Sequence, residues 1–120
     1  MSRKIIICDD ESLILDVLAL ALTNDETDVI ATTDNMEIMS LIELVKPDLL
    51  LTDLQMPKVC GDTIVQQIRN SEKFNQLPVI IMSASLLGEQ AARDCGADGF
   101  LAKPFDLDEL YFLVEKLLRA

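Results

Sequence analysis

The sequence contains no histidine, so a structural zinc site of the usual kind is disfavoured and the chain cannot itself carry phosphohistidine. It also lacks a Gly-rich phosphate loop and a Walker-type lysine, which leaves no evident means of binding ATP. Its only cysteines, Cys8, Cys60 and Cys95, are an odd number at wide spacing. We expect all three to be buried thiols in a reducing compartment.

Basic residues are scarce, with ten against 21 acidic residues and a formal net charge of −11. This charge repels the phosphate backbone and removes the electrostatic attraction that drives most nucleic-acid binding. We therefore expect no direct contact with DNA or RNA.

Long apolar runs are missing too. The longest, residues 13–22, contains Asp16 and is about half of the ~20 residues that a membrane span needs. The apolar run at the N-terminus is interrupted by acids after residue 8, which is too early for a signal peptide. No low-complexity stretch marks a linker. We expect one cytoplasmic domain over residues 1–120, with no membrane insertion.

Short apolar runs alternate with segments of helical periodicity along the whole chain, which is typical of a parallel sheet covered by helices on both faces. The predicted strands are residues 4–8, 28–32, 48–52, 79–82 and 99–102. With right-handed crossovers they form a doubly wound α/β sheet, in which the ligand crevice lies at the carboxyl ends of the strands.

Helices are predicted between these strands. Asp34 with Glu37, and Asp106 with Glu109, have the spacing of a helix-capping pair. The fourth helix is expected from about residue 86 to 95, ended by Gly96. The first helix should bury a stripe made of Leu13, Ile14, Val17, Leu18 and Ala21.

Five polar residues follow the predicted strands: Asp9, Asp10, Asp53, Ser83 and Lys103. Each alone is an ordinary loop residue, but topology places all five at one edge of the sheet. Three carboxylates in one crevice repel each other, and a hard divalent ion removes that repulsion. Oxygen ligands without histidine or thiolate favour Mg2+, and Ca2+ remains an alternative although the sequence has no EF-hand loop spacing.

The same residues indicate phosphoryl chemistry. Asp53 stands alone at the end of the central strand and suits the role of a nucleophile toward phosphorus, whereas the adjacent pair Asp9 and Asp10 suits metal binding. Lys103 would supply positive charge to the transferred group. Ser83 would donate a hydroxyl hydrogen bond to a phosphoryl oxygen, although it could instead cap the following helix.

Five motifs carry a family resemblance: Cys8-Asp9-Asp10-Glu11, Asp53-Leu54-Gln55-Met56-Pro57 with Gly61 and Ile68-Arg69, Met82-Ser83-Ala84, Gly96-Ala97-Asp98, and Phe100-Leu101-Ala102-Lys103-Pro104-Phe105. Together they resemble the receiver domain of bacterial two-component response regulators over essentially the whole chain. The resemblance implies strand order 2-1-3-4-5 and a flavodoxin-like fold.

It also implies roles for individual residues. Asp53 would be the phosphoacceptor, with Asp10, Asp53 and the backbone carbonyl of Gln55 as Mg2+ ligands, and Asp9 would hold a metal-bound water. Ser83, Ala84 and Lys103 would contact the phosphoryl group. Ser83 and Phe100 would form the switch, and the bond before Pro104 would be cis.

The resemblance further implies partners. The donor would be a sensor histidine kinase or a histidine phosphotransfer protein that docks near Asp53 on the first helix. Phosphorylation would change the surface of the fourth helix, fifth strand and fifth helix, so that it binds a downstream protein or forms a homodimer. This surface would expose Leu86, Tyr111, Phe112 and Leu118.

Three other hypotheses remain. A hydrolase of small phosphate esters needs a general acid and a cap over its substrate, and neither is evident. An interaction module without phosphoryl transfer is disfavoured because every carboxylate, hydroxyl and amine of the site is present. A flavin-binding protein needs a hydroxyl-rich loop after the first strand, where this chain has acids.

Overall fold

The computed structural model describes residues 3–119 and contains one five-stranded parallel sheet. Its strand order is β2-β1-β3-β4-β5, which confirms the predicted fold. The strands are β1 Arg3–Cys8, β2 Thr27–Thr32, β3 Leu49–Asp53, β4 Val79–Ser83 and β5 Gly99–Ala102. Each boundary lies within one residue of the prediction, and Asp53 and Ser83 are the last residues of their strands.

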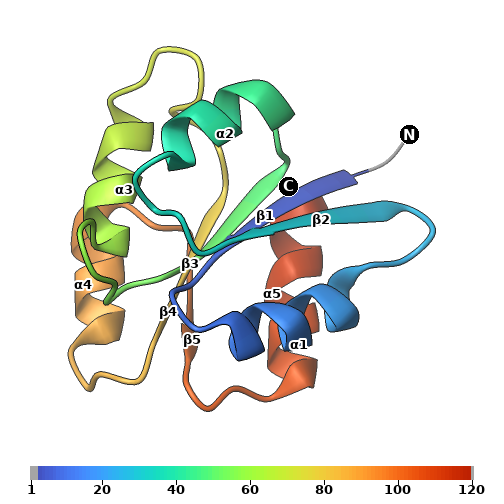
Figure 1. Ribbon diagram of the computed structural model, residues 1–120. Helices are drawn as coiled ribbons and strands as arrows, with labels where there is room; N and C mark the ends of the chain where they lie inside the picture. The colour runs from blue at the N-terminus through green and yellow to red at the C-terminus, as the bar shows by residue number, and fades with distance from the viewer. Residues whose placement is uncertain (1–2, 120) are drawn as a thin grey trace.

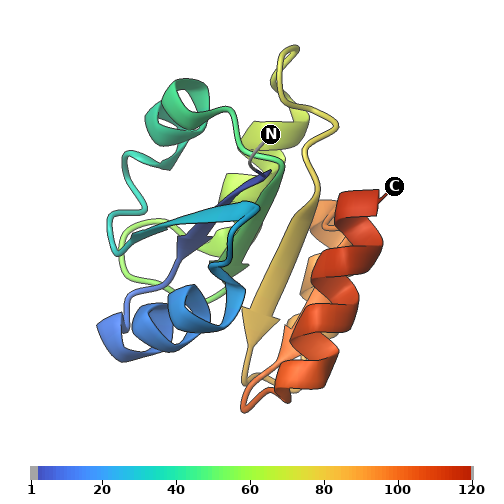
Figure 2. The same cartoon turned by 90° about the vertical axis from the view of Figure 1, so that its right-hand side faces the viewer.

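Helices cover both faces of the sheet (Figures 1 and 2). On one face lie α1 and α5, and on the other lie α2, α3 and α4. The helices are α1 Ser12–Leu22, α2 Ile38–Val45, α3 Gly61–Arg69, α4 Gly88–Cys95 and α5 Leu107–Arg119. Successive strand residues point to opposite faces, and the strands are apolar at almost every position. Both faces of the sheet are therefore apolar, and each forms its own core with the helices that cover it.

The two cores divide the strand residues by alternation. Ile5, Ile7 and Met82 pack with α1 and α5, whereas Ile6 and Ile81 pack with α2, α3 and α4. All five are fully buried. Burial of such side chains contributes roughly 1.5–3 kcal/mol each. The carboxyl ends of the strands are thereby held by a rigid core.

The register of the sheet brings the strand ends level with each other. Cys8 of β1 pairs with Thr52 of β3, so the residues that follow them, Asp9 and Asp53, start from adjacent positions. On the other side, Ser83 of β4 pairs with Ala102 of β5, the residue before Lys103. The predicted site residues therefore leave the sheet at one edge.

The predicted stripe of α1 is correct for Leu18, which is buried, and for Ile14 and Ala21, which are partly buried against the same core, but it is wrong for Leu13 and Val17. The buried side chains of this helix are Leu15, Leu18 and Leu22, whereas Leu13 is 72% exposed and Val17 is also exposed. The segment is apolar almost all round, so periodicity did not determine which side meets the sheet. The misassigned residues leave an apolar surface on α1.

Two predictions about helix ends differ in outcome. The carboxylate of Asp34 accepts a hydrogen bond from the Met36 backbone within a turn, and α2 begins only at Ile38 without a side-chain cap. At α5, Asp106 accepts the backbone N–H of Asp108 at 2.8 Å, which confirms the Asp106 half of the predicted capping pair. The fourth helix also begins two residues late, because residues 86 and 87 belong to a turn.

Cys60 is exposed in the loop before α3, so the expectation that all three thiols are buried is wrong for this residue. Cys8 and Cys95 are buried as predicted.

Between residues 3 and 119, no helix has both the length and the apolar character required to cross a bilayer.

Candidate functional site

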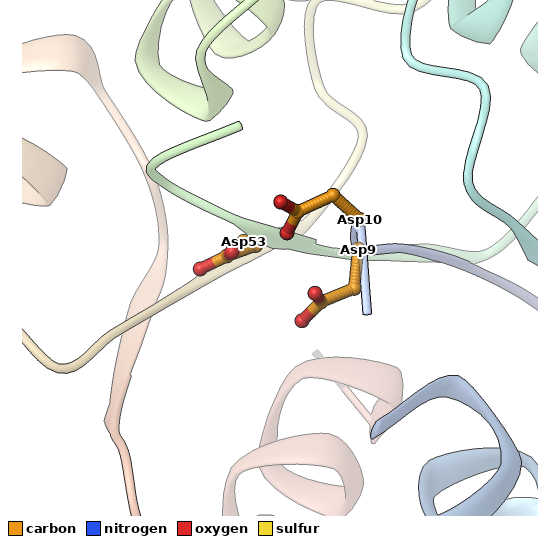
Figure 3. Close-up of side chains that lie close together, drawn as sticks. All are labelled: Asp9, Asp10 and Asp53. Atoms are coloured by element: carbon orange, nitrogen blue, oxygen red, sulfur yellow. The ribbon is translucent and has the colours of Figure 1, made fainter. Parts of the chain in front are cut away.

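Three carboxylates meet at the carboxyl edge of the sheet (Figure 3). Asp9 and Asp10 directly follow β1, and Asp53 ends β3. One oxygen of each lies within 4.8 Å of the others. Asp9 is fully buried and Asp53 nearly so, whereas Asp10 is exposed. The three acids therefore share one small volume that opens to solvent on the side of Asp10.

The ammonium group of Lys103, the residue that follows β5, joins this cluster. The Nζ atom of Lys103 lies 2.9 Å from Oδ2 of Asp9 and 3.3 Å from Oδ1 of Asp53. Its backbone N–H donates to the carbonyl of Ser83, which anchors the end of β5 to the end of β4. The peptide bond between Lys103 and Pro104 is cis. Lys103 thus bridges the two buried carboxylates.

The electrostatics of the cluster show that one lysine does not balance three acids. Burial, followed by the charge of Asp9, raises the pKa of the Asp53 carboxyl even though Lys103 opposes the rise. Burial lowers the pKa of Lys103, but its bond to Asp9 and the charges of both acids outweigh burial, so the net shift is upward. The Lys103 ammonium therefore stays protonated, and ionisation of the Asp53 carboxyl costs free energy.

The donor set fits a hard divalent cation. The atoms available are carboxylate oxygens, and one of the three carboxylates is open to solvent, where waters could complete an octahedron. The nearby thiol of Cys8 does not compete, because burial raises its pKa to about 11 and keeps it protonated. Mg2+ is the ion that such ligands favour.

Ser83 and Phe100 meet around one glycine. A Cβ atom added at Gly88 would lie 2.8 Å from Cβ of Ser83 and 3.0 Å from Cε1 of Phe100. Ser83 is buried, and its Oγ accepts the Ser85 N–H at 3.0 Å. From the sequence, Gly88 was interpreted only as a residue that weakens the fourth helix. No local sequence pattern shows that it lies beside Ser83 of β4 and Phe100 of β5. The contact joins the strand end to the aromatic ring.

The remaining predicted residues lie around the cluster. Gln55, in the loop after β3, has an exposed side chain. Ala84 is exposed and lines an apolar groove with Lys103 and Phe105. The loop itself is drawn against β3, because the N–H of Gly61 donates to the Leu54 carbonyl at 2.7 Å.

Fold and site together define a flavodoxin-like α/β domain with an acidic cluster, able to hold a metal ion, at the carboxyl edge of its sheet. Residues 5–115 match the family described as Response regulator receiver domain. The chain belongs to this family. Receiver domains are regulatory phosphoacceptor modules and not conventional enzymes, and they act with histidine kinases.

Individual relatives agree with the family assignment. The chain is 36% identical over 120 residues to the DNA-binding dual master transcriptional regulator RpaA of Synechocystis sp., covering 97% of this chain and 49% of RpaA. It is 32% identical over 121 residues to the response regulator MprA of Mycobacterium tuberculosis, covering 99% of this chain and 52% of MprA. The chain thus spans about half the length of these curated relatives.

Solved structures show the same fold. A Chloroflexus aurantiacus chain assigned as a response regulator superposes with a TM-score of 0.94 at 25% identity, with both chains fully covered. The receiver domain of a Pseudomonas aeruginosa sensor histidine kinase superposes with a TM-score of 0.89 at 23% identity, again with both fully covered. The latter crystal structure holds a magnesium ion in its active-site cleft.

Proposed function

We propose that this chain is a cytoplasmic phosphorylation switch that accepts a phosphoryl group on Asp53 in a reaction that depends on Mg2+. The observation that carries the proposal is the geometry of the cluster. Asp53 is nearly buried, lies within 4.8 Å of two further carboxylates and has the Lys103 ammonium 3.3 Å from its Oδ1. Such a constellation suits the transfer of a phosphoryl group to Asp53, because positioning and neutralisation of charge supply most of the catalysis of that reaction.

In the proposed reaction a carboxylate oxygen of Asp53 forms a bond to phosphorus while the P–N bond of a donor phosphohistidine breaks. The bonding electron pair stays on the imidazole nitrogen. Mg2+, held by Asp10, Asp53 and the Gln55 carbonyl with Asp9 holding a bound water, would neutralise the negative charges that meet there. Lys103 would turn from Asp53 to a phosphoryl oxygen while it keeps its bond to Asp9, and Ser83 would donate its hydroxyl hydrogen.

The donor is proposed to be a sensor histidine kinase or a histidine phosphotransfer protein. An apolar groove beside the site supports this, because it is lined by Ile14 and Val17 of α1, by Phe105 and also by Lys103. In this proposal, the protein that brings its histidine to Asp53 covers this groove. The exposed apolar side chains of α1 would then be buried against the donor, which accounts for their position beside the acidic site.

The output is proposed to run through α4, β5 and α5. Movement of Ser83 toward the phosphoryl group would free space at Gly88 next to Phe100. The surface beyond it exposes Leu86, Leu87 and Phe112, the last at 66%. Tyr111 is exposed as expected, but its hydroxyl donates to the Ala21 carbonyl at the end of α1, and Leu118, expected to be exposed, is partly buried against the core beneath α1 and α5. We propose that a downstream protein, or a second copy of the chain, binds this surface after phosphorylation. Phe112→Ser should abolish phosphorylation-dependent binding or dimerisation but leave phosphorylation intact, and unchanged binding would remove this part of the proposal.

The central experiment is incubation of the protein with acetyl phosphate and Mg2+, followed by intact-mass measurement. The expected result is a gain of one phosphoryl group that EDTA prevents and Asp53→Asn abolishes. Asp16→Asn, which changes an exposed acid on α1, is the matched control and should be modified normally. Modification of the Asp53→Asn variant at the same level would refute Asp53 as the phosphoacceptor. Continuous release of phosphate from simple esters would instead indicate a hydrolase.

A further inference from the structure

A buried amide connects two loops beside the acidic cluster. Asn35 lies between β2 and α2 and is only 5% exposed. Its side-chain Nδ2 lies 2.7 Å from the carbonyl oxygen of Pro57 and 2.6 Å from that of Val59. Because carbonyl oxygens only accept, the nitrogen of the amide must face them, and both of its hydrogens are used.

The two accepting carbonyls belong to a strained turn. The N–H of Val59 donates to the Pro57 carbonyl at 2.9 Å, and the residue between them, Lys58, has φ 72°. The positive φ and the hydrogen bond between residues two apart are those of the classic γ-turn, which is rarer and more strained than the inverse γ-turn. A residue with a Cβ atom adopts it only when its surroundings enforce it. The amide of Asn35 binds the first and last carbonyl of this turn and thereby holds it closed.

The turn lies in the loop that carries Gln55, a proposed ligand of the cation. Residues 54–60 follow Asp53 directly, and their other fixed points are the Gly61-to-Leu54 backbone bond and the buried Met56 side chain. The proposed cation ligand Gln55 sits between these points. Asn35 also lines a cavity of about 320 Å3 together with Asp10 and Lys58. The amide therefore touches the loop from the side on which Asp10 opens to solvent.

We propose that Asn35 is a positioning residue for the cation site: its carboxamide fixes the 54–60 loop so that the Gln55 carbonyl and Asp53 bind Mg2+ together. This inference rests on the proposed function. It assigns no contact between Asn35 and the ion or the phosphoryl group. Without the amide, the turn at Lys58 would relax toward an ordinary conformation and the loop would have to be ordered when the cation binds.

The test is calorimetric titration of the whole chain with Mg2+. Asn35→Leu keeps the size of the side chain and removes both donors, and we expect it to weaken Mg2+ binding about tenfold, as loss of outer-sphere support typically does. Thr32→Val is the matched control, since Thr32 Oγ1 accepts the Asp34 N–H in the same segment but does not reach the 54–60 loop. The control should bind Mg2+ like the unmodified chain.

A purely structural role predicts a different result. In that case Asn35→Leu would lower the midpoint of urea unfolding in EDTA but would leave the Mg2+ affinity unchanged, and this outcome overturns the inference. If the unmodified chain does not bind Mg2+, the proposed function fails together with the inference. If it binds and Asn35→Leu binds equally well, only the role of Asn35 fails.

Asn35→Asp provides a second test that does not depend on the folding of the Leu variant. The carboxylate has the same shape but presents an acceptor to two carbonyl oxygens, and it adds a negative charge near Asp10. Charge alone would tighten Mg2+ binding, whereas loss of the loop's support weakens it. Weaker binding supports the inference, and tighter binding overturns it.

Discussion

Replacement of Lys103 by methionine would test the electrostatic account of the site most directly. The substitution keeps a long apolar chain but removes the ammonium that lies 2.9 Å from Asp9 and 3.3 Å from Asp53. The Asp9 side chain is fully buried and that of Lys103 is 14% exposed. Removing one partner of a buried pair costs about 3–5 kcal/mol, and the residual exposure of Lys103 favours a loss of about 3 kcal/mol. For a domain of this size that corresponds to a fall in Tm of roughly 10 °C.

The pH dependence of this loss has a definite sign. The folded-state pKa of Lys103 is raised, so its contribution is fully present below the lysine pKa of the unfolded chain and is lost only as pH rises through the folded value. On the acid side, the pKa of Asp53 is already raised, and removal of the ammonium raises it further. Protonation of Asp53 then removes part of the unbalanced charge. The loss should therefore be larger at pH 8 than in mild acid.

The assay is urea unfolding of the unmodified chain and of Lys103→Met, in EDTA, at both pH values. A double variant, Asp9→Asn with Lys103→Met, is the control, because replacing both members of a buried pair costs less than removing one. It should be more stable than Lys103→Met alone. If the single variant is as stable as the unmodified chain at pH 8, or if the double variant is the least stable, the buried pairing does not stabilise the fold as described.

Three further predictions follow from the structure. The raised pKa of Asp53 means that the folded chain binds the proton of this carboxyl more tightly than the unfolded chain does, so the free energy of unfolding falls as pH rises and Asp53 ionises. Asp53→Asn should therefore be more stable than the unmodified chain in EDTA at pH 8. Equal or lower stability in urea unfolding would contradict this. Gly61→Ala should cost about 1–3 kcal/mol, since its Cβ would collide with the backbone oxygen of Asp53. Gly88→Ala should cost less because its neighbours are side chains, and the reverse order in urea unfolding would be inconsistent with this packing. Arg69→Leu should destabilise the fold by about 2 kcal/mol, because the guanidinium donates to three carbonyls and a carboxylate; an unchanged Tm would show that these bonds contribute nothing.

The sheet and its order were predictable because strands and helices have different periods and because parallel crossovers restrict the topology. The same rules located the edge where Asp9, Asp53 and Lys103 meet. Their close approach depends only on strand order and register, which the apolar pattern specifies. The meeting of Asp9, Asp53 and Lys103 could therefore be predicted, although the three residues are far apart in the sequence, because the apolar pattern determines the strands that they follow.

Other features required information that no local pattern contains. Leu13 and Val17 of α1 were wrongly expected to be buried because they are as apolar as the leucines that face the sheet. Gly88 and Asn35 matter through contacts with β4 and with the loop after β3, and each is a small or polar residue that sequence rules assign to turns. Such roles depend on how two elements meet in space, so they emerge only with the structure.

The adjacent acids Asp9 and Asp10 show how one strand end places the same residue type in two different environments. Asp9 is fully buried, and its two oxygens are already used, one by the Glu11 N–H at 2.9 Å and one by Lys103. Asp10 is exposed beside Asp53. Lys103 lies closer to Asp9, at 2.9 Å, than to Asp53, at 3.3 Å, so the oxygens of Asp9 are the more fully used of the two buried carboxylates. Asp9 holds Lys103 in place, which keeps an ammonium beside Asp53 where negative charge would gather during phosphoryl transfer.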